Sequence, residues 1–232
     1  MLITLSNQTQ AFQTVEFELV LERQRPCVVN FAVEEPIDPS KPFLLALGEG
    51  TQVFSCGEVQ VTAVKSPDGL HFECFAVGLL HGLLETQVRR QISQKNYLQA
   101  FKTLAAEARL GFTSQLSVPS SQVESLVVLG SLRNGLDQLQ EIYSLGASRW
   151  YLDPAAKRLV LLEQGHFPVE PVPLPVSDLV ANLEEGPELA PLCGLIPYLP
   201  VVWAGKTEVL DKVSYRSSTG TMCLRFASYS GL

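Results

Sequence analysis

Charged side chains are scarce in this chain of 232 residues. Asp, Glu, Lys and Arg together make up 18% of it, hydrophobic residues make up 46%, and the mean hydropathy is +0.16. A surface with so few charges leaves apolar area facing water, and monomers rarely keep large apolar patches uncovered. The composition therefore favours a protein that buries part of its surface in an oligomer.

Clustered positive charge is also missing. The formal net charge is −7, and basic residues stand side by side only at 89–90 and 157–158. Binding to a phosphate backbone depends on grouped Lys and Arg side chains that displace counterions. We therefore expect no specific recognition of nucleic acid.

The common motifs of nucleotide binding and hydrolysis are absent. The sequence contains no GxGxxG, no GxxxxGKS/T, no GxSxG and no HExxH, which removes the usual signatures of nucleotide-binding loops, hydrolase nucleophiles and zinc peptidases. We expect a protein that is not an enzyme, with no catalytic residue, no cofactor site and no metal site.

Histidine is rare, and its three positions offer little chemistry. His81 and Glu85 are four residues apart and could share a helix face, but a metal site needs a third ligand, so we expect a solvated pair. His71 lies close to Cys74 in sequence, but on the opposite face of a strand, which argues against a catalytic dyad. His166 falls in a turn-like segment.

Paired acids and adjacent aromatic residues also have simple interpretations. The acids at 34–35 and 184–185 lie in loop-like sequence, where solvated charge is the expected role, since adjacent strand residues point apart. Trp150 and Tyr151 stand next to each other without surrounding cations. A place in a core or interface is therefore expected for them, in preference to base stacking.

Cysteine occurs five times, an odd number, with no CxxC spacing. Most of these residues lie within apolar runs, which is typical of buried free thiols in a reducing compartment. We expect no disulfide and no catalytic thiol among Cys27, Cys56, Cys74, Cys193 and Cys223.

Long apolar runs and an export signal are missing as well. Residues 1–6 have no basic region and no extended apolar stretch, so we expect no signal peptide. No run approaches the roughly 20 apolar residues of a membrane-spanning helix, so we expect no insertion into a membrane.

Most of the recognisable pattern has the two-residue period of strands. Residues 15–22 alternate apolar and acidic, residues 58–65 and 70–77 flank a turn at 66–69, and residues 27–33 and 43–47 are further strands. Residues 198–203, 213–216 and 222–226 continue this character. Because a lone terminal hairpin would leave open edges, we expect it to pair with the N-terminal sheet.

Two helices are expected between these β segments. The first runs from an N-cap at Ser93 to Gly111, and the second runs from an N-cap at Asn134 to about Leu145, with Gly146 as its stop. Residues 148–152 and 158–162 then form a strand pair, and the proline-rich stretch 167–176 is a connector.

The predicted fold class is therefore α+β, with a predominantly antiparallel β barrel or sandwich and about two short helices. The predicted domains are a barrel-like domain of residues 1–80 plus 196–232 and a helix-containing domain of residues 81–195.

Four segments succeed one another in a characteristic order. Residues 52–59 and 70–77 form a strand and a crossing strand, residues 83–93 are leucine-rich and then basic and polar, and residues 136–162 form a helix and a strand pair. Over residues 10–165 this order resembles the late-control D family of phage tail baseplate hubs, which is related to the hub domain of type VI secretion spike proteins.

The resemblance implies a structural function. Proteins of this family join the tail tube to the central spike as a homotrimeric ring, with a channel for the tape-measure protein and then for DNA. The implied location is the tail baseplate of the virion, after assembly in the bacterial cytoplasm. Glu16, Glu18 and Glu22 share a strand face and are candidates for the channel wall or the outer surface.

Two alternatives remain open at the sequence level. One is a small hydrolase or peptidase whose site needs two of the histidines, or a histidine and a cysteine, to converge. The other is a generic β-rich cytoplasmic interaction domain, for which a monomeric mass in solution would be typical.

Overall fold

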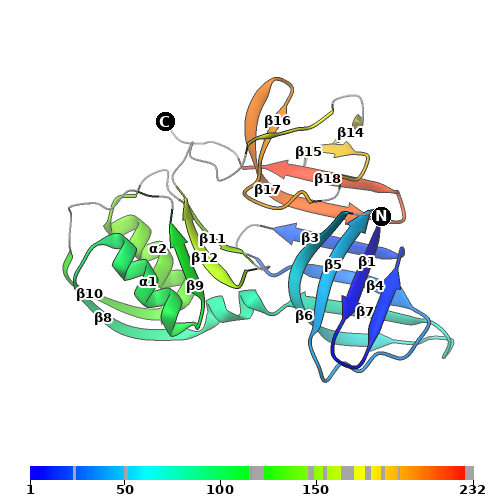
Figure 1. Cartoon of the computed structure of the whole chain (residues 1–232), viewed down its shortest axis with the longest axis horizontal. Coiled ribbons are helices and arrows are strands. Elements are labelled where there is room, and N and C mark those ends of the chain that lie inside the picture. The colour runs from blue at the N-terminus through cyan, green and yellow to red at the C-terminus, as the bar shows by residue number, and fades with distance from the viewer. Residues whose placement is uncertain are drawn as a thin grey trace. The chain divides into compact units, whose positions relative to one another are not determined.

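The computed structural model describes residues 1–22, 25–49, 52–114, 116, 123–145, 149–153, 156–162, 170–175, 179–183, 186–192 and 194–227. The chain divides into two compact units. Unit 1 comprises Met1–Leu79 and Val169–Ser230, and unit 2 comprises Leu80–Pro168 and Gly231–Leu232. Antiparallel strands predominate and two α-helices are described (Figure 1), so the predicted α+β class is confirmed.

Unit 1 is built almost entirely of strands. Its elements are β1 (Leu2–Ser6), β2 (Ala11–Thr14), β3 (Phe17–Glu22), β4 (Val28–Val33), β5 (Phe43–Glu49), β6 (Gln52–Lys65), β7 (Phe72–Gly78), β13 (Val172–Pro173), β14 (Leu179–Leu183), β15 (Gly186–Leu189), β16 (Pro200–Trp203), β17 (Lys206–Arg216) and β18 (Thr221–Phe226).

One large sheet connects these strands, in the order β14-β15-β18-β17-β3-β4-β7-β6-β5-β1-β2, and β16 pairs with β17 on one side and with β13 on the other. The 14 residues of β6 pair with β5 over their first part and with β7 over their second part. The sheet therefore curls into a half-barrel around its core (Figure 1).

The two ends of the chain share this sheet, as predicted. In the β3–β17 pair, Tyr215 lies opposite Leu19 and Val213 opposite Leu21. Tyr215 is buried, and its hydroxyl donates to the carbonyl of Leu192 at 2.9 Å. The terminal hairpin of β17 and β18 thus completes the N-terminal sheet instead of leaving two open edges.

The alternation expected over residues 15–22 is confirmed only from residue 17 onward. Phe17, Leu19 and Leu21 are buried and Glu18 is exposed, but Val15 is 62% exposed. The strand begins at residue 17, where the backbone N–H of Phe17 donates to Ser217 Oγ at 2.8 Å. Val15 precedes the paired region, so the two-residue period does not reach it.

The boundary after the proline-rich connector differs from the expected one. Residues 169–195 were expected in the helical domain, but β15 pairs with β18, where Leu189 lies opposite Met222. β13, which contains Pro173, pairs with β16 alone, because a proline has no N–H to donate and tolerates only the edge of a sheet.

Unit 2 combines the two helices with short strands. Its elements are the 3-10 helix η1 (Leu80–Glu85), β8 (Gln87–Lys95), α1 (Tyr97–Glu107), β9 (Gly111–Ser114), β10 (Val123–Ser131), α2 (Leu132–Ile142), β11 (Arg149–Asp153) and β12 (Arg158–Leu162). β8 and β10 form an antiparallel ribbon, and β11, β12 and β9 form a second small sheet.

Both predicted helix starts were wrong by three residues. Ser93 lies in β8, and the N-cap of α1 is Asn96, whose side chain accepts from the N–H of Gln99 at 3.0 Å. The N-cap of α2 is Ser131, whose hydroxyl accepts from the N–H of Asn134 at 3.3 Å. In both cases a strand leads directly into the helix, and the N-cap lies at this junction, just after β8 for α1 and at the last residue of β10 for α2.

The predicted helix ends were wrong too. α1 ends at Glu107, and Gly111 opens β9. α2 ends at Ile142 and is capped by Tyr143, whereas the expected stop, Gly146, lies outside the described residues.

The core of unit 2 is packed around Trp150. Its side chain has no exposed surface, and its Nε1 donates to Asp137 Oδ1 at 3.0 Å. Phe101, Leu104 and Leu136 are equally buried in the same cluster. The predicted core position of Trp150 is confirmed.

Candidate interaction surfaces

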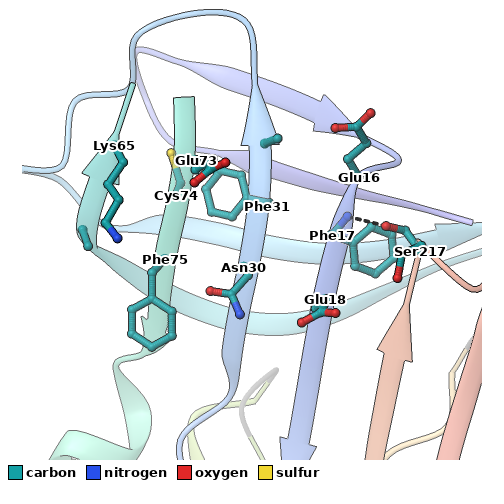
Figure 2. Close-up of a pocket in the computed structure, with 13 residues that line it drawn as sticks. Glu16, Phe17, Glu18, Asn30, Phe31, Lys65, Glu73, Cys74, Phe75 and Ser217 are labelled. Carbon is teal, nitrogen blue, oxygen red and sulfur yellow. Dashed lines mark hydrogen bonds between the residues drawn. The ribbon is translucent and has the colours of Figure 1, made fainter. Parts of the chain in front are cut away.

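Three grooves of unit 1 meet at Glu16, just before β3. The first, of about 450 Å³, crosses β3, β4 and β7 and is called the β3–β7 groove (Figure 2). The second, of about 630 Å³, lies between β2 and the end of β4 and is called the β2–β4 groove. The third, of about 700 Å³, extends toward the β17–β18 turn.

The strand register builds the floor of the β3–β7 groove. Glu18 lies opposite Asn30, and Asn30 lies opposite Phe75. Figure 2 shows these three side chains in a row across β3, β4 and β7. Phe17 and Phe31 also border this groove, and both are buried members of the core.

Three carboxylates, Glu16, Glu18 and Glu73, line this groove, with Lys65 as the basic side chain among its described lining residues. Arg216 lies opposite Glu18, and Lys65 lies opposite Glu73. Opposite charges in facing positions stabilise neighbouring strands modestly. The β3–β7 groove is therefore a mixed polar surface around a half-buried Phe75.

The β2–β4 groove has a different charge. Glu16, Glu34 and Glu35 line it, together with His71 and the exposed Val15. No Lys or Arg is among the described residues that line it. The paired acids at 34–35 are exposed, and the groove places them beside Glu16.

A histidine–aspartate pair stands at the rim of this groove. His71 Nδ1 lies 2.6 Å from Asp68 Oδ2 in the turn between β6 and β7. The hydrogen bond and charge of Asp68, with smaller contributions from Glu34 and Glu16, raise the pKa of His71 above its usual value. The hydrogen bonds from His71 and Leu70 lower the pKa of Asp68.

β2 forms one end of the large sheet. At one end of the groove, the side chain of Gln10 joins the β1–β2 hairpin to the loop after β4: its Nε2 donates to the carbonyl of Pro36 at 3.1 Å, and its Oε1 accepts from the N–H of Asp38 at 3.0 Å. Among the described strands, β2 pairs with β1 and not with β4. The side chain of Gln10 therefore supplies the two hydrogen bonds between the β1–β2 hairpin and the loop after β4.

The three acids expected on one face of β3 have different surroundings. Glu22 accepts from Arg225 at 2.6 Å, and Arg225 also reaches Asp211 at 2.7 Å. Glu16 and Glu18 line the grooves. Only these two therefore remain candidates for contact with another molecule.

The buried thiols are poor nucleophiles. Burial raises the pKa of Cys27 to about 12 and that of Cys74 to about 11, so both are protonated near neutral pH and lack the reactive thiolate. Cys56 is also a buried cysteine, and Cys223 is a partly exposed one. Cys193 lies outside the described residues.

Of the histidine and cysteine side chains that the structure describes, His71 and Cys74, the pair considered from the sequence, do not meet. Cys74 Sγ points to the carbonyl of Phe72, whereas the exposed ring of His71 is bound to Asp68. Glu85, expected in a solvated pair with His81, is exposed and accepts from Arg133 Nε at 3.4 Å. Among the residues described, no group of three or more His, Cys, Asp or Glu side chains is arranged to hold a metal ion.

The remaining acids and histidine singled out in the sequence, at 184–185 and 166, lie outside the described residues. Within the part of the chain that the structure describes, no helix is both long enough and apolar enough to cross a membrane.

Sequence patterns did not predict the exposed face of the β8–β10 ribbon in unit 2. Val127 and Leu129 on β10 are each 56% exposed, and they lie opposite Gln91 and Arg89 on β8. On the other face of the ribbon, Val128 is buried under the helices. Because residues 126–129 form a continuous apolar run, the sequence does not show which side chains face water.

Charge is divided unevenly between the units. Of the 24 acidic and 17 basic side chains, 17 acidic and 8 basic ones lie in unit 1, which leaves 7 acidic and 9 basic ones in unit 2. The formal net charge is therefore −9 for unit 1 and +2 for unit 2.

Neither protein-family models nor curated proteins match the sequence. Solved structures do match the fold. One is a 43 kDa tail protein of prophage MuSo2 from Shewanella oneidensis, with a TM-score of 0.70 and 9% identity over 97% of this chain and 98% of that one. Another is a tail protein from Neisseria meningitidis MC58, with a TM-score of 0.63 and 12% identity over 97% and 95% of the two chains.

A third match comes from a secretion system. The Escherichia coli c3393 protein is a component of the type VI secretion system with structural similarity to the T4 bacteriophage tail proteins gp27 and gp5. It aligns with a TM-score of 0.62 and 14% identity over 99% of this chain and 78% of that one. The expected resemblance is confirmed for the fold, which this chain shares almost from end to end with tail proteins and a type VI secretion component.

Proposed function

We propose that this chain is a structural component of a phage or phage-like tail, the baseplate hub that joins the tail tube to the central spike. The observation that carries the proposal is the match with the MuSo2 tail protein, which extends over 97% of this chain and 98% of that one. A fold alone does not establish function, but here several tail proteins share the whole architecture, and both units take part.

The surface chemistry supports a binding function in preference to catalysis. The grooves around Glu16 combine carboxylates with a half-buried Phe75 and an exposed Val15. Cys27 and Cys74 are held as thiols by burial. Such surfaces bind by shape and charge and offer no activated nucleophile. We therefore assign no enzymatic activity to the chain.

The proposed assembly is a homotrimeric ring. The partners would be the tail tube, the spike and, in the central channel, the tape-measure protein, and the site would be the tail of the virion. The net charge of −7 would let DNA pass through the channel without binding, because like charges repel.

Light scattering coupled to size exclusion tests this proposal. We expect a mass about three times the 25.4 kDa of one chain, and binding to the tube and spike proteins of the same phage when these are expressed with it. A monomeric mass at all concentrations and salt levels, without binding to either partner, would instead favour a generic interaction domain.

A further inference from the structure

We propose that the ring is closed by contact between two different surfaces, the acidic β2–β4 groove of unit 1 in one copy and the exposed face of the β8–β10 ribbon of unit 2 in the next copy. This inference rests on the proposed ring. The occupant to which it commits is a second copy of this chain.

Charge complementarity is the first argument. Glu16, Glu34 and Glu35 line the groove without a lysine or arginine among the described lining residues. On the ribbon, Arg89 is exposed and forms no ion pair with any residue that the structure describes. Arg90, in contrast, is bound to Glu107 at 3.1 Å. The formal net charge is −9 for unit 1 and +2 for unit 2. These opposite charges favour contact of unit 1 with unit 2 of the next copy over contact between two copies of the same unit.

Apolar complementarity is the second argument. Val15, in the groove, is 62% exposed, and Val127 and Leu129, on the ribbon, are each 56% exposed. Leu129 lies directly opposite Arg89, so one patch of the ribbon offers an apolar and a cationic side chain together. The groove offers the matching combination of a valine among carboxylates, as the apolar centre and polar rim of an interface require.

The form of the contact explains how a ring can close. Because each copy carries both the groove and the ribbon face, each can offer one to the preceding copy and the other to the following copy. A contact between unlike surfaces forms rings when the rotation closes. A contact between two identical surfaces would stop at a dimer.

Charge reversal tests the contact. We expect Glu34→Arg with Glu35→Arg, and separately Arg89→Glu, to weaken trimer formation about tenfold or more, because like charges then face each other. The triple variant E34R/E35R/R89E should recover most of the association, since it restores opposite charges across the same contact. Sedimentation equilibrium over a range of protein concentrations measures all three.

Matched control variants distinguish the assigned contact from a general effect of surface charge or polarity. Lys102→Glu makes the same charge change as Arg89→Glu at an exposed position of α1 and should leave the mass unchanged. Val127→Ser should weaken association, whereas Val53→Ser, at a valine that is 74% exposed, should not. All of these side chains face solvent, and circular dichroism verifies the fold of each variant.

The outcomes separate this inference from the proposed function. A trimeric wild type whose charge-reversed variants remain equally trimeric, or a triple variant no tighter than the weaker parent, overturns the assigned contact and leaves the hub proposal in place. A wild type that stays monomeric at every concentration overturns the assigned contact, and it overturns the hub proposal as well when the protein also fails to bind the tube and spike proteins.

Discussion

In unit 1, β3 from the first part of the chain pairs with β17 from its last part, whereas the helices and strands of unit 2 all lie between residues 80 and 162. The hydrogen bond from Phe17 to Ser217 joins residues 200 positions apart. In unit 2 the paired strands lie much nearer in sequence, as in the pairing of Leu129 with Arg89. Stability in unit 1 therefore depends on long-range pairing, and in unit 2 on helix caps and local packing.

The largest expected effect comes from truncating the core of unit 2. Phe101→Ala removes a fully buried ring and should lower the free energy of unfolding by about 3–5 kcal/mol. Hydrogen exchange read by mass spectrometry should show the loss in peptides of unit 2, while peptides of unit 1 keep their protection, because the two cores are separate clusters.

Lys102→Ala, at the exposed neighbouring position, serves as the control and should leave both units unchanged. If protection fell equally in both units, the comparison between them would fail, since they would then unfold as one.

The next largest loss of stability is expected in unit 1, from substitution of a glycine. Gly186 has a φ of +136°, and a Cβ added there would lie 1.9 Å from the carbonyl oxygen of Leu224. We expect Gly186→Ala to cost at least about 1–3 kcal/mol from the backbone conformation alone, with a further loss from the separation of β15 and β18. Thermal unfolding measures it.

Gly205 provides the matched control. It also has a positive φ, of +79°, but a Cβ there would meet nothing within 4 Å. Gly205→Ala should therefore cost clearly less than Gly186→Ala. Equal losses would show that the close approach of β15 to β18 contributes nothing.

Helix capping should have a smaller effect, confined to unit 2. Ser131→Ala removes the hydroxyl that accepts from the N–H of Asn134 and should cost about 1 kcal/mol. Asn134→Ala, within the first turn of α2, should be neutral or slightly stabilising, because alanine is the better helix former. Urea unfolding measures the loss of stability in each variant. A larger loss for Asn134→Ala than for Ser131→Ala would show that Asn134 is the N-cap, as the sequence had suggested.

The smallest effect is expected at the exposed pair of unit 1. Nuclear magnetic resonance should show the pKa of His71 above its usual value of 6.5, and Asp68→Asn should return it toward that value. Because the folded state raises this pKa, any stabilisation is present below the unfolded-state pKa and is lost as the pH rises through the folded-state pKa.

Both side chains of this pair face water, so His71→Gln should leave the melting temperature unchanged. A clear decrease in the melting temperature of that variant at acidic pH would show that the turn contributes to the stability of the half-barrel.

Local patterns predicted the elements that depend on neighbouring residues. The alternation from Phe17 to Glu22 identified a strand and its buried face, and the turn at 66–69 identified the β6–β7 hairpin. The patterns failed where two elements adjoin. Because β8 and β10 run directly into helices, Ser93 and Asn134 looked like N-caps, although the caps are Asn96 and Ser131.

The sequence by itself determined the scarcity of charge, the strand-rich composition and the order of elements from which the fold of tail proteins was recognised. Only the tertiary structure decided which residues meet at Glu16, which face of β10 is exposed, and that β13, β14 and β15 join the large sheet. The physical reason is that periodicity records the burial of side chains within one segment. Strands pair through backbone N–H and C=O groups, which nearly all residues have. The sequence of one strand therefore says little about which other strand it pairs with.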